Sequence, residues 1–423
     1  MNKDWETSQG LPDTLGWTAN TLDFNGALVM TGNVVAANGS PDMQTTKYDL
    51  EGNISWQKEY DFTGDRDYGI AITTGLGGEI IAVGASYDTA TSNFDIVIIS
   101  YDDFGNILWT TRYDGGGGDI PTAVTTDSNG EIYICASTGD ASGNSDFVAL
   151  KFDMSGNLVW DEKYDYQGMD DIPAGMVISP NNELVITGGS QTQTGDWDYA
   201  TLRYDASNGT LLGSSRQSVS GVSIDKPSAI MMDVNNNYFI TGVVYDSTGA
   251  ADIETIKLND TLGVEWTSTW DGTGFDDEAH AIGLDSNGDV YVTGYTGTLG
   301  SRTLLTLKYD GNAGTVLWTL EESNGALFNG EGYDLRVDQE DLIYVSGYQE
   351  DTNGSDLYLV CYDMEGTKLW EQIQNPVEEE GRGYYHQRCR RYLCFRPIIQ
   401  WPNYSTNSSS TVPIKGQLSR IPV

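Results

Sequence analysis

The sequence predicts an all-β protein built from a unit that repeats about every 52 residues. The first observation is a series of tryptophans in one sequence context, 51 to 53 residues apart with one double interval: Trp5, Trp56, Trp109, Trp160, Trp266, Trp318 and Trp370. Gly213 stands at the missing step of the double interval. The second observation is that each interval holds the same short apolar runs separated by turn residues. Repeats of this length bury their apolar faces against neighbouring units.

The unit from residue 266 to 318 shows the expected elements in order. Its apolar runs alternate as strands do, and Asn287–Gly288 between two of them is a strong hairpin signal. No segment shows a helical period. The four expected strands are 265–270, 279–284, 290–294 and 304–310.

The same pattern recurs in seven complete units. Its most regular part is the third strand, at 28–32, 80–84, 132–136, 184–188, 238–242, 290–294 and 343–347. Four-stranded antiparallel units arranged radially form a β-propeller. We therefore predict a propeller of seven complete blades over residues 10–376, with an eight-bladed parent as an alternative. The tryptophans are predicted to pack one blade on the next.

One group of motifs resembles a known family. Gly288 to Gly294 reads Gly-Asp-Val-Tyr-Val-Thr-Gly, Lys308–Asp310 reads Lys-Tyr-Asp, and a glycine and Trp318 follow. This pattern is similar to the bacterial seven-bladed β-propeller repeat family known as SBBP, over residues 1 to about 380. The resemblance implies the propeller fold and an extracellular or cell-surface setting in a bacterium. It supplies no catalytic residue.

The two ends differ from the middle. Residues 1–9 are predicted to form the outer strand of a closing blade, and residues 377–383 begin an eighth repeat. Residues 384–423 contain no Asp or Glu and six Lys or Arg. We interpret this tail as the disordered product of a frameshift, with a basic binding tail as the alternative. Its cluster of Cys389, Cys394 and His386 is then accidental and not a zinc site.

Charge and composition exclude several classes of partner. The net charge of -40 argues against binding to nucleic acid or to anionic membranes. No run of 18 apolar residues suggests a membrane span, and the residues before Trp5 leave no room for a signal peptide in this chain. Cys135 and Cys361 occupy strand-like apolar positions, so we expect buried free thiols.

The two faces of the predicted propeller differ in their loops. One carries tight turns such as Asn129–Gly130, whereas the other carries the longer, acidic connections such as 113–119 and 191–196. Because loops carry most propeller function, we expect a protein or glycan to bind the loop-rich face. The candidate ligand-binding residues in or near its loops are Trp197, Tyr87, Tyr245, Tyr295 and His280.

Two series of aspartates recur at fixed positions. The first lies 17 residues before the third-strand glycine or its equivalent: Asp67, Asp119, Asp171, Asp225 and Asp277. Equal register could form a carboxylate ring that holds Ca²⁺, or each Asp could cap its own turn. The second series opens the fourth strand and is interpreted as structural: Asp42, Asp95, Asp146, Asp198, Asp252 and Asp356.

No Ser–His pair, nucleophile elbow or phosphate loop is present in the repeats, so the sequence favours a non-enzyme. The expected function is that of a non-catalytic extracytoplasmic binding or scaffold module, monomeric or part of a larger surface protein. We expect no cofactor, with bound Ca²⁺ as the alternative. The alternative is a propeller enzyme, either a quinoprotein-like oxidoreductase or a glycan-active enzyme, with His280 as the residue that would matter most.

Overall fold

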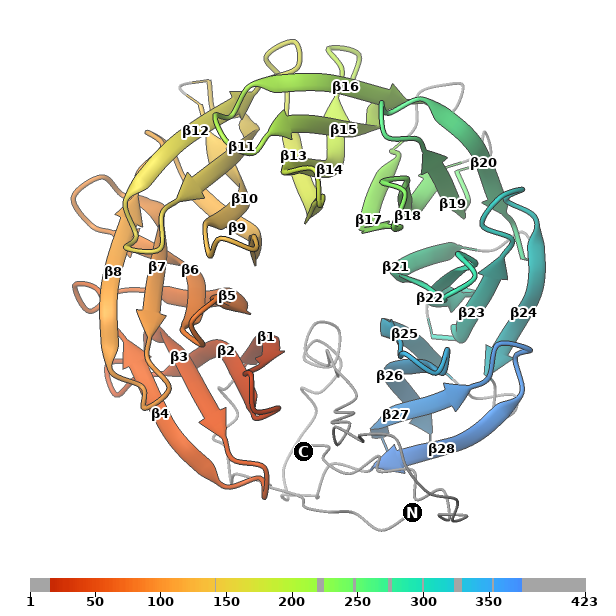
Figure 1. Cartoon of the computed structure of the whole chain (residues 1–423), viewed down its shortest axis with the longest axis horizontal. Coiled ribbons are helices and arrows are strands. Elements are labelled where there is room, and N and C mark those ends of the chain that lie inside the picture. Colours follow the sequence, from red (N-terminus) through yellow and green to blue (C-terminus); the bar gives the residue numbers. More distant parts are fainter. Residues whose placement is uncertain are drawn as a thin grey trace, which may run out of the picture.

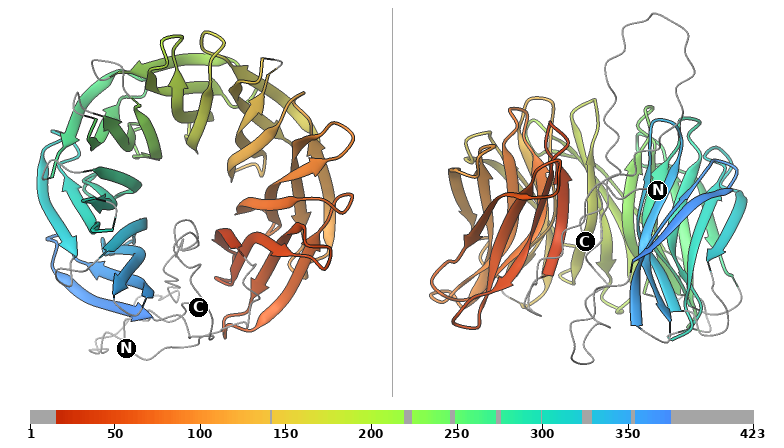
Figure 2. Two further views of the ribbon diagram at one scale, coloured as in Figure 1. Left: turned by 180° about the vertical axis from the view of Figure 1, so that it is seen from behind. Right: turned by 90° about the horizontal axis from the view of Figure 1, so that it is seen from below.

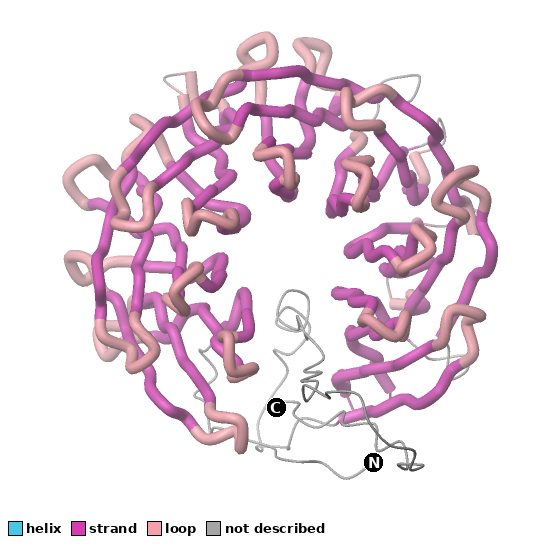
Figure 3. Tube along the Cα trace, viewed as in Figure 1, coloured by secondary structure: helices cyan, strands magenta, loops and turns pink. Residues whose placement is uncertain are grey.

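The protein is described here by a computed structural model that covers residues 16–374, apart from 141, 219–223, 246–248, 273–275, 299, 323–328 and 352–353. The described residues form seven four-stranded antiparallel sheets and no helix (Figure 3). The sheets follow one another in chain order around a central axis (Figure 1). The predicted seven-bladed β-propeller is therefore confirmed. No helix in this part of the chain has the length and hydrophobicity needed to cross a membrane.

Each blade is one continuous stretch of chain whose four strands pair in sequence order from the innermost to the outermost. Blades 1 to 3 are β1 (Gly16–Leu22), β2 (Leu28–Val35), β3 (Pro41–Tyr48), β4 (Ile54–Tyr60); β5 (Asp67–Thr74), β6 (Ile80–Asp88), β7 (Asn93–Tyr101), β8 (Ile107–Tyr113); β9 (Asp119–Thr126), β10 (Ile132–Gly139), β11 (Ser145–Phe152), β12 (Leu158–Tyr164). Blades 4 and 5 are β13 (Asp171–Ile178), β14 (Glu183–Gln191), β15 (Trp197–Asp205), β16 (Leu211–Gln217); β17 (Lys226–Met232), β18 (Tyr238–Tyr245), β19 (Ala251–Leu258), β20 (Val264–Trp270). Blades 6 and 7 are β21 (Asp277–Leu284), β22 (Val290–Thr296), β23 (Thr303–Tyr309), β24 (Val316–Glu322); β25 (Asn329–Val337), β26 (Ile343–Asp351), β27 (Gly354–Tyr362), β28 (Lys368–Gln374).

The interval between the last blade and the first is wider than the other intervals around the circle (Figure 1). The expected closing strand at 1–9, the start of an eighth repeat at 377–383 and the tail at 384–423 lie outside the described residues. The eight-bladed parent and the frameshift therefore stay predictions. Turns and loops project from both ends of the ring (Figure 2).

The core lies between neighbouring sheets. Residues 96 to 99 of β7 are fully buried because one side of the strand packs on blade 1 and the other on blade 3. A strand buried on both faces needs an unbroken apolar run, which this segment provides. Cys135 and Cys361 are buried free thiols, as predicted.

Every innermost strand contains a β-bulge at the same place. The register of the strand pair shifts by one residue there, which leaves one residue of the inner strand without an opposite partner. The bulge residues are Thr18, Ile70, Thr122, Ala174, Ser228, His280 and Tyr333. The sequence analysis did not single out these bulges.

The tryptophans join each blade to the next through one repeated contact. The indole N–H of Trp56 donates to the backbone oxygen of Asp103 at 3.0 Å, and that of Trp266 to Gly311 at 3.1 Å. The equivalent bonds of three further tryptophans are Trp109 to Met154, Trp160 to Ala206, and Trp318 to Met364. Each acceptor lies in the outer turn of the following blade, so the predicted packing role is confirmed.

Blade 4 lacks this tryptophan and compensates with an arginine. Gly213 lies on β16 where the other blades carry the indole. There, Arg203 of β15 donates to the backbone oxygen of Asp260, in the equivalent turn of blade 5. The carbonyl at the equivalent position of the turn is therefore hydrogen-bonded by a residue of a different strand. This contact explains how the repeat tolerates the missing indole.

Replacing Trp266 by Phe tests the contact between blades. Phe keeps the aromatic ring but removes the N–H and leaves the Gly311 carbonyl without its donor. We expect the free energy of unfolding to fall by about 2 kcal/mol, measured by denaturant titration. Leu317→Ala, at a half-exposed position of β24, serves as the control and should change it by less than about 0.5 kcal/mol. Equal effects of both variants would contradict the role of the indole.

Candidate functional site

The first aspartate series lies at the start of the innermost strands. Asp67, Asp119, Asp171 and Asp277 are the first residues of β5, β9, β13 and β21. All four, and Asp225 before β17, are fully buried, so they do not form a ring that is open to the channel. Each of the four accepts a hydrogen bond from a backbone N–H of the preceding connection, for example Tyr166 to Asp171 at 2.7 Å. The turn-capping interpretation is therefore confirmed.

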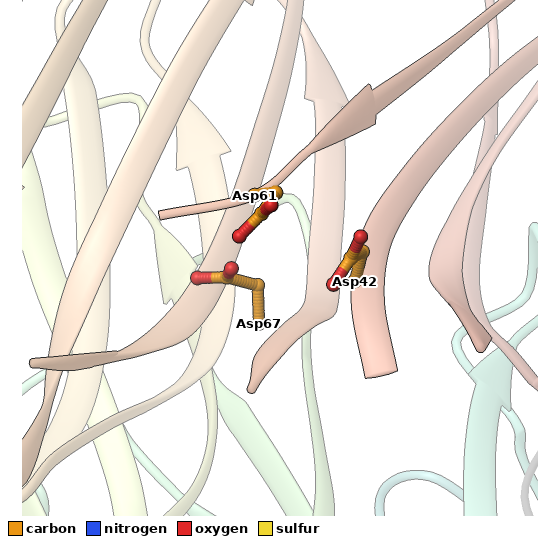
Figure 4. Close-up of side chains that lie close together, drawn as sticks. All are labelled: Asp42, Asp61 and Asp67. Carbon is orange, nitrogen blue, oxygen red and sulfur yellow. The ribbon is translucent and has the colours of Figure 1, made fainter. Parts of the chain in front are cut away.

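The two aspartate series nevertheless meet between blades. Carboxylate oxygens of Asp42, Asp61 and Asp67 lie within 4.8 Å of one another, and the three side chains converge on one point (Figure 4). Asp42 opens β3 of blade 1, Asp61 follows β4, and Asp67 begins β5 of blade 2. We call such a group an inter-blade triad. The other three are Asp95–Asp114–Asp119, Asp146–Asp165–Asp171 and Asp252–Asp271–Asp277.

The third member of each triad was not singled out in the sequence. Asp61, Asp114, Asp165 and Asp271 each lie five residues after the tryptophan of their blade, so their spacing offered a signal. Only the fold shows that this position meets the other two, because it belongs to the connection between blades. Asp198 and Asp225 are not joined by such a residue, since Ser218 occupies this position.

Burial dominates the electrostatics of the triads. It raises the pKa of Asp67, Asp146 and Asp171 to about 6, and neighbouring carboxylates add to the rise. The pKa of Asp277 is raised for the same reason. Near neutral pH the triads therefore hold several negative charges at close range, and these charges repel one another.

Two of the five candidate ligand-binding residues are buried. Trp197 is 8% exposed, and the ammonium of Lys226 lies 4.1 Å from the centre of its ring. Tyr295 is 1% exposed and is covered by the guanidinium of Arg302 at 3.8 Å. Neither offers the exposed ring face that stacking of a sugar requires. The expectation that these two rings are accessible to a ligand is therefore wrong.

The other two aromatic candidates are half-buried. Tyr87 packs edge-on against Phe94, with the Arg66 guanidinium 4.4 Å from its centre. Tyr245 ends β18, and its backbone N–H donates to Asp225. Tyr295 and His280 belong to blade 6 and are in contact, whereas Tyr87, Trp197 and Tyr245 lie in blades 2, 4 and 5, so the five candidates do not form one site.

His280 is the bulge residue of blade 6. Its Nδ1 lies 2.9 Å from the backbone oxygen of Gly332 in blade 7. The imidazole is stacked on Tyr333, with centroids 5.6 Å apart, and meets the edge of Tyr295. The imidazole also lowers the pKa of the neighbouring Glu278.

The His280 contact has counterparts at other bulges. Thr18, Thr122 and Ser228 donate their hydroxyls to backbone oxygens of the following blade, at the position that corresponds to Gly332. His280 thus occupies a repeated structural position, where an imidazole replaces a hydroxyl. This observation favours a structural role for His280.

A groove on the tight-turn face lies between blades 1 and 2. It has a volume of about 330 Å³ and is formed by the β1–β2, β5–β6 and β7–β8 turns and the start of β8. Its acidic and apolar lining residues are Asp23, Phe24, Glu79, Asp102, Asp103 and Leu108. Phe24 is 64% exposed and Leu108 is 52% exposed. The sequence comparison of the two faces missed this groove, because it assigned ligand binding to the longer loops.

The charge of the groove is negative. Asp23 and Asp103 share the ammonium of Lys47, and Glu79 bonds to a backbone N–H of its own turn. Hydrogen bonds from Asn106 lower the pKa of Asp102, so its charge persists in mildly acidic solution. Four carboxylates therefore lie beside two exposed apolar side chains, with Lys47 paired to two of them and Lys58 near Asp102.

Comparison with known proteins shows a similarity of fold only. No family model matches the sequence, and no curated protein matches it. Among solved structures, Sqt1 of Chaetomium thermophilum, bound to the N-terminus of the ribosomal protein L10, is similar with a TM-score of 0.54 and 11% identity, covering 86% of this chain and 88% of that chain. An ulvan lyase of polysaccharide lyase family PL25 is similar with a TM-score of 0.52 and 10% identity, covering 83% and 93%. The SBBP resemblance stays an expectation.

The raised pKa values predict how stability depends on pH when divalent cations are removed. Folding raises the pKa of Asp67, Asp146 and Asp171 from 3.8 to about 6, so the folded state binds protons more tightly. Their contribution is complete below the unfolded pKa near 4 and is lost as the pH rises through about 6. In buffers with a chelator, we expect the free energy of unfolding to fall from about pH 4 to about pH 7.

Two variants check this assignment. Asp171→Asn cannot ionise and should make the decline with pH smaller. Asp153→Asn is the control, because hydrogen bonds from Asn157 lower the pKa of Asp153, and its contribution is lost only as the pH falls. A wild-type stability that rises through this interval, or an unchanged decline in Asp171→Asn, would contradict the assignment.

Proposed function

We propose that this propeller is a non-catalytic binding module that recognises a short basic protein segment in the groove between blades 1 and 2. The observation that carries the proposal is the combination of four carboxylates with the exposed rings and methyl groups of Phe24 and Leu108. A segment with lysine or arginine beside one apolar residue matches both features.

The groove is suited to binding because its walls are rigid. Each contributing turn is closed by a backbone hydrogen bond between its ends and by a carboxylate, for example Asp102 with Phe104 and Asn106. A preformed surface loses little conformational entropy when a ligand binds. Phe24 lies at the tip of its turn, with one edge of its ring beside Gly78 of blade 2 and most of the ring exposed.

The comparison with Sqt1 is in accord with this function at the level of the fold. That propeller binds the N-terminus of a ribosomal protein, so the architecture accommodates a protein segment as ligand. We also propose an extracellular or cell-surface setting, which is supported only by the repeat motifs that resemble SBBP. The monomeric state is a further part of the proposal.

Binding can be measured by fluorescence anisotropy with a short labelled peptide of alternating lysine and leucine. We expect saturable binding that weakens as salt is added. Phe24→Ala should weaken it about tenfold, equivalent to about 1.4 kcal/mol. Asp102→Asn should also weaken it, because it removes one charge of the groove.

Matched variants separate the groove from the general negative charge of the protein. Val234→Ala truncates a 94% exposed apolar side chain in the β17–β18 turn of blade 5, outside the groove. Asp153→Asn removes the aspartate that caps the equivalent turn of blade 3. Both should leave the affinity within about twofold of wild type. Equal losses in Val234→Ala and Phe24→Ala would contradict the proposed site.

A glycan-active enzyme is the second candidate, favoured by the group formed by His280, Glu278 and Tyr333 at the inner strands of blades 6 and 7. This candidate predicts eliminative cleavage of a polysaccharide such as ulvan, in which loss of a proton and of the glycosidic oxygen leaves an unsaturated chain end. His280→Ala should abolish cleavage while the melting temperature falls only slightly. Full activity in His280→Ala, or no cleavage by wild type, would argue against it.

A further inference from the structure

The interface between blades 3 and 4 brings three carboxylates to one point. Oxygens of Asp146, Asp165 and Asp171 all lie within 4.8 Å of one another. Asp146 belongs to β11 of blade 3, Asp165 follows β12, and Asp171 begins β13 of blade 4. Two sheets and the connection between them therefore contribute oxygen atoms to the same small volume.

Two of these oxygens are buried without a hydrogen bond, Oδ1 of Asp146 and Oδ1 of Asp171. Asp146 is only 6% exposed, and its Oδ1 is buried and accepts no hydrogen bond. The other two side chains cap backbone groups, since Asp165 accepts from Gly168 and Asp171 accepts from Tyr166. A buried carboxylate oxygen without a donor is costly. The position of Asp146 between two other carboxylates adds repulsion to that cost.

Other blades neutralise the equivalent aspartate with an arginine of the outer strand. Asp95 pairs with Arg112 at 2.8 Å, and Asp198 pairs with Arg216 at 2.6 Å. Both arginines lie in the same register on their strands. The fold therefore places a cation at this point in blades 2 and 4.

Blade 3 carries Lys163 in that register, and this lysine makes a different contact. Its Nζ donates to the backbone oxygen of Gly115 at 2.7 Å. Lys163 offsets only part of the rise in the pKa of Asp146. Within the described ranges, no basic side chain lies at ion-pair distance from Asp146.

We propose that the Asp146–Asp165–Asp171 triad is a binding site for a divalent cation of the calcium type that joins blade 3 to blade 4. Calcium takes six to eight oxygen ligands in flexible geometry, and carboxylates can bind it through one or both oxygens. The ion supplies the positive charge that arginine supplies in blades 2 and 4. The triads Asp42–Asp61–Asp67 and Asp252–Asp271–Asp277 have the same positions in the repeat.

The fourth triad differs because an arginine already occupies part of it. Arg112 binds Oδ2 of Asp95 in the Asp95–Asp114–Asp119 triad. A cation there competes with a bound guanidinium, so this triad binds calcium more weakly than Asp146–Asp165–Asp171. The binding of a cation between blades does not depend on the peptide groove, which lies at the tight turns of blades 1 and 2.

The test uses the full chain, first treated with a chelator and then dialysed against calcium chloride. Bound calcium is counted by elemental analysis, and melting temperature is recorded in parallel. We expect calcium to raise the wild-type melting temperature by at least about 3 °C. Asp146→Asn should bind one ion fewer per chain. In the presence of chelator it should melt above the wild type, because the substitution removes the repulsion.

Asp198→Asn is the matched control. It changes the equivalent residue of blade 4, where Arg216 supplies the cation and Ser218 replaces the third aspartate. It should lower the melting temperature with and without calcium and leave the number of bound ions unchanged. Potassium chloride at equal ionic strength should not reproduce the calcium effect.

The proposal is overturned if the wild type retains no calcium at millimolar concentration. It is also overturned if Asp146→Asn binds as many ions as the wild type, or if potassium chloride produces the same rise in melting temperature. The peptide-binding assay with Phe24→Ala addresses a different surface, so failure of either proposal can be recognised separately.

Discussion

The arrangement of the blades depends on one repeated contact, in which an indole N–H donates to a carbonyl in the outer turn of the next blade; blade 4 uses Arg203 in its place. Trp56, Trp109, Trp160, Trp266 and Trp318 all make it. The indole packs over a glycine of that turn. Gly156, for example, lies beneath Trp109, and an added side-chain atom there would collide with the indole. A four-stranded sheet exposes apolar surface on both sides, so the angle set by this contact determines whether the next sheet covers that surface.

The same contact explains why charge accumulates between blades. Docking the sheets brings the end of one outer strand beside the start of the next inner strand, and both ends need polar caps for their backbone groups. Aspartate serves both purposes in this chain, as Asp165 and Asp171 show by capping Gly168 and Tyr166. Each aspartate stabilises its own strand end by capping backbone groups. Together, however, these caps place three carboxylates close to one another, where they repel. In blades 2 and 4 an arginine neutralises part of this negative charge. In other blades the charge remains to be neutralised by a bound cation or by a proton.

Repetition also separates residues that serve the fold from residues that serve a ligand. His280 is unique as a residue type in the repeats, yet its contact to Gly332 follows the pattern of Thr18 and Ser228 in other blades. Phe24 also follows a repeated position, beside Gly78 of blade 2, but it remains 64% exposed and is therefore accessible to a ligand. Position in the repeat is therefore a better guide to function here than residue chemistry.

The sequence by itself determined the fold class, the seven blades, the strand order and the packing role of the tryptophans, because these follow from local periodicity and turn residues. It also indicated the capping role of Asp67 and its equivalents. Only the tertiary structure decided which residues meet: it buried Trp197 and Tyr295, replaced the missing indole at Gly213 with Arg203, and joined Asp61 to Asp42 and Asp67. The physical reason is that spacing along one strand fixes the face on which a residue lies, whereas contacts between blades depend on the docking angle and on one-residue bulges, which sequence periodicity does not record.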